Sequence, residues 1–375
     1  MEFNKHDLQE LDARHQLALK LRAAPAKRLR AGAYAQNIPF PDGFAPVPQP
    51  ISPAPTATHP LPQVDVIAMM DTEAEAQAIA DVLTPGHRWE SWKTKAWYSY
   101  TVSNFAKQYL PQIGPQGPSR SSRCLGSYFV TQIAGKKVLC YKTELHMHED
   151  AKKMPDGTYS LPIKDMLTHI IQEAKPSVFL TTGTSGGLYC SMHLGDVVVS
   201  RAARFMCQRD FASAPFNNKT FQSPPWDVPT GYQAAAEKLM QQYAGNLSNK
   251  TKPPQNNCAC SSPGYPTSIF FDGQDGIPAF HPILTTDFFE YGTSTNNLDK
   301  LGMAVEMDDA ALGLACSEMS SPPKWACVRN LSDPAINGQL PSAAQDKCAE
   351  YYYKEFGYWT TVMSALTTWA IVAGL

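Results

Sequence analysis

Hydrophobic positions alternate along this chain between short runs that predict buried strands and longer stretches with helical spacing. Residues 64–69 form an apolar run, and residues 73–83 follow with Ala76, Ile79 and Leu83 on one helical face. Similar patterns predict strands at 137–141, 177–181, 196–200, 268–271, 304–307 and 325–331, and helices at 163–174, at 308–318 and from about 344 onward. A glycine turn is predicted at 183–187. This alternation predicts a layered α/β sheet whose ligands bind at the carboxyl ends of its strands.

Two segments interrupt this pattern. Residues 5–22 predict a short amphipathic helix, and residues 14–30 hold six basic side chains and no acidic one. Nine of the twenty-four residues at 39–62 are Pro, which favours extended chain over packed elements. We therefore predict a basic helix and Pro-rich linker over 1–62 and a catalytic domain over 63–375, with a surface insertion at about 208–265. The tail is either a poorly ordered extension, which we favour, or a docking helix.

Composition narrows the classes of protein further. The 375 residues carry a net charge of −2, and only 18% are charged, so no global feature points to nucleic acid. Nine Cys without a disulfide framework predict a reducing compartment, the cytoplasm, and Cys258-Ala-Cys260 lacks the spacing of a zinc or redox site. The apolar stretch at 359–375 carries four Thr and one Ser, which predicts a packed terminal helix and no membrane span.

Four motifs occur in an order and spacing typical of one family. They are Thr182-Gly-Thr-Ser-Gly-Gly-Leu188, Leu194-Gly-Asp-Val-Val-Val-Ser200, Val305-Glu-Met-Asp308 and Val328-Arg-Asn-Leu-Ser-Asp333. Together they resemble the nucleoside phosphorylase and nucleosidase superfamily, and most closely the nucleosidases that hydrolyse methylthioadenosine and adenosylhomocysteine. The resemblance covers most of residues 64–375. It implies a three-layer αβα sandwich with a mixed central sheet, a homodimer, and cleavage of a purine N-glycosidic bond without a metal or organic cofactor.

The resemblance also assigns catalytic roles. Asp333, preceded by Ser332, matches the general acid that protonates the purine N7, a task that requires burial to raise its pKa. Its alternative role is a cap before Pro334. Glu73 matches the base that deprotonates the attacking water, with Glu75 as a competing alignment. Thr184 and Arg329 match residues that hold this water, although Arg329 is equally well explained as a structural ion-pair partner.

Other residues are assigned to substrate binding. Met307 and Asp308 match the Met-Glu pair that packs on the ribose and accepts its hydroxyl hydrogens. Asp308 is one methylene shorter than the family's Glu, and Asp309 could share its task. Phe288 is expected to stack on the base, with a core position as the alternative. Met70, in the segment before Glu73, completes the predicted binding site.

The nucleophile follows from residues that are missing. The phosphorylases bind phosphate through an Arg before the glycine turn and through a Gly-Asp-Pro-x-Arg loop, whereas this chain has Thr181 and Met69-Met70-Asp71 there. Water is therefore the expected nucleophile. Two alternatives stay open: a phosphorylase that uses Arg201 or Arg204, and a non-catalytic nucleoside-binding or storage protein on the same fold.

The segment at 139–150 departs from the family, which has a short glycine turn there. His146 and His148 are expected to share one face of a strand. Two imidazoles at this spacing can ligate a metal, but no third ligand is evident, so we expect a surface or pocket-rim pair. Recognition of an unusual 5′ substituent by this segment is the alternative.

Overall fold

The computed structural model describes residues 34–89, 97–189, 191–247, 267–290, 298–335 and 342–375. The predicted helix at 5–22 and the Cys258-Ala-Cys260 pair lie outside these residues. The described helices are α2 (Glu73–Leu83), α3 (Phe105–Gln108), α4 (Pro118–Ser122), α5 (Pro162–Ala174), α6 (Gln233–Ala244), α8 (Asp309–Ser317) and α9 (Ser342–Gly374).

The strands of the described residues form one mixed sheet. They are β1 (Val47–Pro48), β2 (Val66–Met70), β3 (Tyr98–Tyr100), β4 (Gly126–Ile133), β5 (Lys136–Thr143), β6 (Val178–Gly187), β7 (Val197–Ser200), β8 (Ala202–Phe205), β9 (Thr220–Gln222), β10 (Ile269–Phe271), β11 (Ile283–Thr285), β12 (Ala304–Glu306) and β13 (Lys324–Pro334). Their main order is β1-β4-β5-β2-β6-β12-β11-β8-β9. The central strand β6 runs parallel to β2 and β13 and antiparallel to β12. The carboxyl ends of β2, β6 and β13 therefore meet at one edge.

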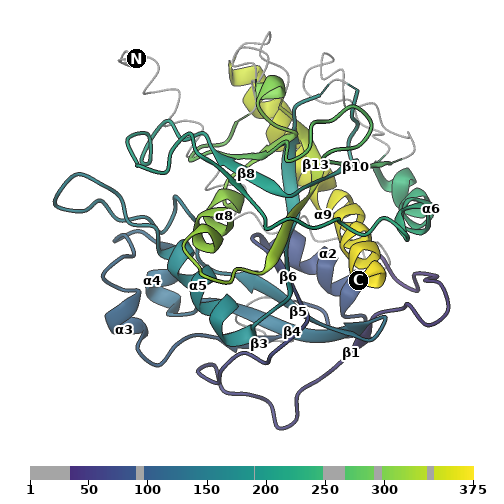
Figure 1. Cartoon of the computed structure of the whole chain (residues 1–375), viewed down its shortest axis with the longest axis horizontal. Helices are drawn as coiled ribbons and strands as arrows, with labels where there is room; N and C mark the ends of the chain where they lie inside the picture. The colour runs from purple at the N-terminus through teal and green to yellow at the C-terminus, as the bar shows by residue number, and fades with distance from the viewer. Residues whose placement is uncertain (1–33, 90–96, 190, 248–266, 291–297, 336–341) are drawn as a thin grey trace.

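Helices cover both faces of this sheet (Figure 1). Side chains of β2 alternate between the two faces: Val66, Ala68 and Met70 pack with α2, α6 and α9, whereas Ile67 and Met69 pack with α5 and α8. A parallel strand buried on both faces requires an unbroken apolar sequence, and residues 66–70 provide one. This arrangement is the three-layer αβα sandwich with a mixed sheet that the resemblance implied.

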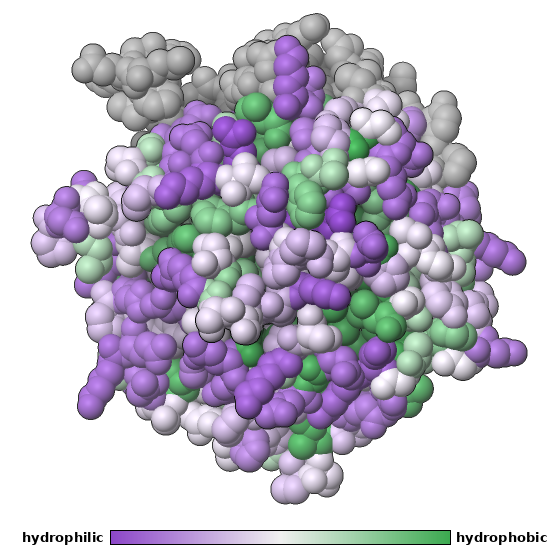
Figure 2. All heavy atoms as spheres, viewed as in Figure 1, coloured by the Kyte–Doolittle hydropathy of each residue, from purple (hydrophilic) through white to green (hydrophobic). Residues whose placement is uncertain are grey.

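The surface carries little of the apolar content. In Figure 2 the hydrophobic residues of the visible face lie in small groups among hydrophilic ones. Val47 and Leu375 are the large hydrophobic residues that the described part of the chain exposes. The predicted terminal helix is buried through much of its length, including Trp369 and Ile371. Among the helices of the described residues, none combines the length and apolar character that crossing a membrane requires.

The predicted glycine turn at 183–187 is wrong. Strand β6 continues through Gly187 because β13 pairs with it along its whole length, from Lys324 opposite Val178 to Pro334 opposite Gly187. Glycines in this strand therefore mark close approach of neighbouring side chains rather than a chain reversal.

The Pro-rich segment packs onto the body, where the sequence predicted an unpacked linker. β1 pairs with the sheet edge at β4, and the Ala35 amide donates to the Tyr358 hydroxyl at 2.9 Å. The Phe40 ring lies 4.9 Å from the Trp369 ring on α9. Proline restricts the unfolded chain, so an extended segment of this kind loses less entropy when it docks.

The described part of the predicted surface insertion also contributes to the core. β9 extends the sheet by pairing with β8, and α6 packs against α9 with Leu239 and Met240 buried. The polar composition of residues 208–265 predicted a surface segment. The prediction did not find α6 as a packed helix because its apolar residues occupy one face only.

The packing of the Pro-rich segment yields a stability prediction. Phe40→Ala removes a half-buried ring from Trp369, so we expect the free energy of unfolding to fall by about 1–2 kcal/mol. Urea denaturation measures this change. Gln36→Ala, at an exposed position just before this segment, is the control and should change stability by less than about 0.5 kcal/mol. Equal stabilities for both variants would mean that the segment does not dock.

Candidate active site

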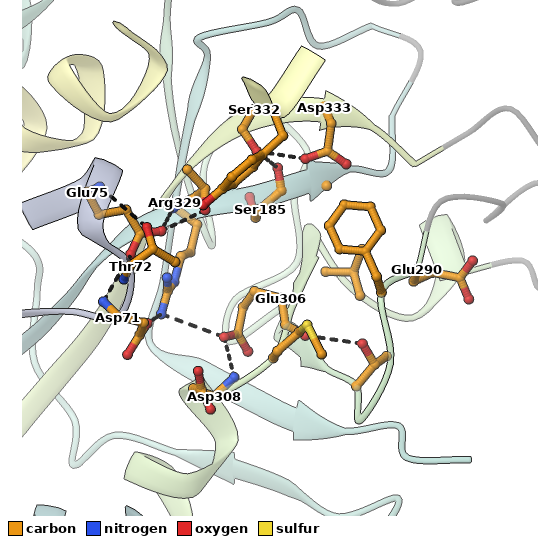
Figure 3. Close-up of a pocket in the computed structure, with 17 residues that line it drawn as sticks. Asp71, Thr72, Glu75, Ser185, Glu290, Glu306, Asp308, Arg329, Ser332 and Asp333 are labelled. Carbon is orange, nitrogen blue, oxygen red and sulfur yellow. Dashed lines mark hydrogen bonds and ion pairs between the residues drawn. The ribbon is translucent and has the colours of Figure 1, made fainter. Parts of the chain in front are cut away.

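A pocket lies where the carboxyl ends of the central strands meet the N-terminus of α2 (Figure 3). Parallel strands direct ligands to this edge, and the first turn of a helix adds unpaired backbone N–H groups. The pocket is lined by Asp71, Thr72, Glu75, Thr184, Ser185, Gly186, Thr286, Phe289, Glu290, Val305, Glu306, Met307, Asp308, Arg329, Ser332, Asp333 and Tyr353.

Arg329 is the cationic centre of this pocket. Its Nε donates to Asp309 Oδ2 at 2.9 Å, and its Nη2 donates to Asp71 Oδ2 at 3.1 Å and to the second Asp309 oxygen. Glu306 lies 3.6 Å from the same Nη2. Burial opposes the charge on Arg329, but these carboxylates outweigh it and raise its pKa well above the ordinary value.

Glu75 binds both the helix and the central strand. One carboxylate oxygen accepts hydrogen bonds from the amides of Asp71 at 2.9 Å and Thr72 at 2.8 Å, which completes a capping box at the start of α2. The other accepts from the Thr184 amide at 2.7 Å and the Thr184 hydroxyl at 2.6 Å. Burial alone would raise its pKa, but the Arg329 charge and these hydrogen bonds lower it. Glu75 is therefore an ionised carboxylate.

A glycine makes this approach possible. A Cβ at position 183 would lie 2.5 Å from Glu75 Oε1 and 2.8 Å from Arg329 Nη1. No side chain larger than hydrogen fits there without moving both charged groups. Gly183 thus allows Glu75 and Arg329 to lie directly against strand β6.

Asp333 lies in the opposite electrostatic environment. It is fully buried, and this burial raises its pKa to about 7, against a small lowering effect of the Ser332 hydroxyl, which donates to its Oδ1 at 2.7 Å. Its Oδ2 is buried and has no hydrogen-bond partner among the described residues. The pocket thus holds a carboxyl group whose raised pKa keeps about half of it protonated at pH 7, together with one that is ionised.

The junction of β12 and α8 supplies three more acidic side chains. Glu306 accepts from the amides of Asp308 at 2.5 Å and Asp309 at 3.0 Å, and from the Thr285 hydroxyl. Burial, followed by the charge of Asp309, raises the pKa of Glu306 well above its ordinary value. Asp308 Oδ1 accepts from the Met147 amide at 2.8 Å, and its Oδ2 lies 3.5 Å from His146 Nδ1.

A comparison with known sequences identifies the family. The profile of the Phosphorylase superfamily matches residues 105–351, well over half of the chain. The chain belongs to this superfamily. It is also similar to a curated 5′-methylthioadenosine/S-adenosylhomocysteine nucleosidase of Desulfotalea psychrophila, with 25% identity over 171 residues. That alignment covers 44% of this chain and 59% of the relative.

Solved structures to which this chain is similar include several nucleosidases. The 5′-methylthioadenosine/S-adenosylhomocysteine nucleosidase of Neisseria meningitidis, solved with methylthio-immucillin-A, matches 83% of this chain and 100% of its own at 15% identity and a TM-score of 0.47. The futalosine hydrolase of Helicobacter pylori matches 83% of this chain and 99% of its own, at 12% identity and a TM-score of 0.47.

The phosphorylase-superfamily chain brings most of the predicted site residues together. Those that line the pocket are Thr184, Met307, Asp308, Arg329, Ser332 and Asp333. Three others lie outside the pocket lining, each one or two residues from a residue that belongs to it: Glu73, Met70 and Phe288.

Glu73 is half-buried and lies in the electrostatic field of Lys142 and Glu144, whereas Glu75 lines the pocket. The capping box explains the difference, because a Glu at the third helical position folds back towards the N-cap. The sequence Thr72-Glu-Ala-Glu75 contains that signature and could have identified Glu75.

Met70 and Phe288 point into the protein interior, whereas the residue that follows each of them lines the pocket. Met70 faces the layer of α2 and α9, and Asp71, the first residue after the strand, lines the pocket. Phe288 is fully buried, and the adjacent Phe289 lines the pocket. Successive side chains of an extended chain point in opposite directions. A shift of one residue in the sequence assignment therefore selects a core residue in place of a pocket residue.

His146 and His148 do not share a strand face. Strand β5 ends at Thr143, and both imidazoles are buried in the turn that follows. The expected shared strand face is therefore wrong, and neither imidazole lies on the surface, whereas His146 reaches the pocket rim through Asp308. In the part of the chain that the structure describes, no group of three or more His, Cys, Asp or Glu residues could hold a metal ion.

No described residue forms a phosphate clamp in this pocket. Arg329 is the only Lys or Arg among the lining residues, and carboxylates already accept hydrogen bonds from its Nε and Nη2. Arg201 lies elsewhere, where it binds Asp272 at 2.9 Å and the Trp226 carbonyl at 2.6 Å. Arg204 does not line the pocket either. The pocket is therefore unfavourable for a dianion.

The pKa of Asp333 leads to a stability prediction. An Asp with a folded pKa of about 7, against ~3.9 unfolded, stabilises the fold at low pH and loses that contribution as pH rises to about 7. Asp333→Asn does not titrate, so its stability relative to wild type should increase by about 2–3 kcal/mol between pH 5 and pH 8. Urea denaturation at both pH values measures the difference. A difference that is independent of pH would mean that Asp333 is already ionised at pH 5.

Proposed function

We propose that this protein hydrolyses the N-glycosidic bond of a purine nucleoside. The observation that carries the proposal is the pairing, in one pocket, of a buried carboxyl group whose pKa is raised to about 7 with an ionised Glu75. Loss of a purine requires an acid for the departing base and a base for the attacking water, and this pair supplies both near neutral pH.

The reaction assigns a role to each group. Asp333 donates its proton to N7 of the purine as the C1′–N9 bond breaks. Water forms the new bond to C1′ and transfers its proton to Glu75. Thr184 and Arg329 hold Glu75 and its surroundings in a fixed geometry, so little reorganisation accompanies the reaction.

The remaining lining residues bind the substrate. The Phe289 ring provides a face for the base, and Met307 packs on the sugar. The Asp308 carboxylate accepts a hydrogen bond from a sugar hydroxyl. It takes the place of the Glu that the resemblance assigns to this position, whose side chain is one methylene longer. The charge of the pocket supports water as the nucleophile, because phosphate would have to approach several acidic side chains where the lining offers one guanidinium, already paired with Asp71 and Asp309.

Release of free base tests the function directly. Purified protein is incubated with purine nucleosides and 5′-thio-nucleosides, each with and without phosphate, and the free base is measured by chromatography. We expect release that is independent of phosphate and that falls by about 10²–10⁴-fold in Asp333→Asn. Release that requires phosphate and yields a sugar phosphate would identify a phosphorylase instead. Ligand-induced thermal stabilisation without base release would support the binding-protein alternative.

A pair of variants on α2 tests the identity of the base. Glu75→Gln keeps the capping box, since Gln serves at that position, but removes the group that accepts the proton. We expect kcat to fall by about 10²–10⁴-fold. Glu73→Gln, two residues away on the same helix, is the matched control and should retain activity within about threefold. A larger loss of kcat in Glu73→Gln than in Glu75→Gln would instead identify Glu73 as the general base.

A further inference from the structure

Asp71 has a carboxylate oxygen for which the structure provides no partner. The residue follows β2, is 4% exposed and lines the pocket. Its Oδ2 accepts from Arg329 at 3.1 Å, whereas its Oδ1 is buried without a hydrogen-bond partner among the described residues. A buried carboxylate oxygen without a donor costs free energy of folding, so a bound ligand is the natural source of that donor.

The position of Asp71 indicates which part of a nucleoside would reach it. Asp71 and Asp333 lie on opposite sides of the pocket (Figure 3). If the base binds at Asp333, the sugar extends towards Glu75, Arg329 and Asp71. The hydrogen-bond donors of an unmodified ribose are its hydroxyl groups, which suit a carboxylate acceptor.

The contacts of Asp308 are a reason to expect a second acceptor for the sugar hydroxyls. Asp308 is one methylene shorter than a Glu, and its carboxylate already accepts from the Met147 amide at 2.8 Å and lies near His146 in the segment after β5. Glu306 is engaged as well, by two amides and a hydroxyl. Asp71 thus has an oxygen with no protein donor among the described residues, whereas Glu306 and Asp308 each accept from protein donors and have less capacity left for a second sugar hydroxyl.

We propose that Asp71 is a substrate-binding residue that accepts a hydrogen bond from a sugar hydroxyl of the nucleoside. This inference rests on the proposed function, which supplies the nucleoside. It assigns the protein a preference for an unsubstituted hydroxyl at one sugar position, and the same carboxylate disfavours a phosphate there.

A cycle of variants and substrates tests the assignment. Asp71→Ala is assayed with a nucleoside carrying all three sugar hydroxyls and with its 2′-deoxy, 3′-deoxy and 5′-deoxy analogues. Asp309→Ala is the matched control, because Asp309 also pairs with Arg329 but does not line the pocket. The ratio of variant to wild-type kcat/KM for each substrate cancels the intrinsic reactivity of the glycosidic bond.

We expect Asp71→Ala to lower kcat/KM by about 10–100-fold for the complete nucleoside and by less than about threefold for one deoxy analogue. The hydroxyl missing from that analogue is then the one that Asp71 binds. Asp309→Ala should affect all four substrates equally. An equal loss across the substrates in Asp71→Ala would overturn the assignment and leave Asp71 a structural partner of Arg329. Asp71→Asn, which keeps the side-chain volume, replaces the Ala variant if that variant unfolds.

Absence of base release from all four substrates with the wild-type protein would contradict the proposed function rather than this inference. Calorimetric binding of the same substrates to wild type and Asp71→Ala then decides the inference separately. A loss of affinity confined to nucleosides with one particular hydroxyl supports it, and a uniform affinity contradicts it.

Discussion

The buried charge of Arg329 is the interaction on which the rest of the pocket depends. Its guanidinium contacts Asp71 after β2, Glu306 at the end of β12 and Asp309 at the start of α8. Asp71 is distant in sequence from Glu306 and Asp309, and the three carboxylates would repel one another without a cation between them. A buried carboxylate deprived of its partner typically destabilises a protein by about 3–5 kcal/mol, so the guanidinium fixes where two strands end and where helix α8 begins. The planar fork of Arg suits this task better than the single ammonium of Lys.

Arg329 also contributes to the difference in pKa between Glu75 and Asp333, the two carboxyl groups proposed to act on the substrate. Glu75 lies within its field and accepts four hydrogen bonds, which keep its pKa low despite complete burial. For Asp333, burial is the main cause of its raised pKa, and no cation contributes to its shift. Two residues with similar side chains thereby differ in protonation at the same pH, because their surroundings differ in charge and hydrogen bonding.

Periodicity and motifs predict the layers of the fold and most of the pocket, but not the side to which individual residues point. The helix at 73–83 and the buried strand before it are found with nearly correct bounds, since both have unbroken patterns. Glu73, Met70 and Phe288 lie one or two residues from lining residues, and these offsets depend on where a strand ends and how a cap folds back. The Pro-rich segment and α6 were missed as packed elements because their contacts with α9 are non-local, such as Phe40 with Trp369.

The segment after β5 shows how a shorter acidic side chain can be retained in such a site. Asp308 cannot reach as far as a Glu, yet the Met147 amide and His146 hold it in one orientation. That segment is itself fixed by Asp150, whose carboxylate accepts from the His146 amide at 2.9 Å and from the Ser119 amide at 3.2 Å. Orientation of Asp308 therefore comes from residues 144–150. The position of Asp308 on the pocket wall therefore depends on a segment that does not itself line the pocket.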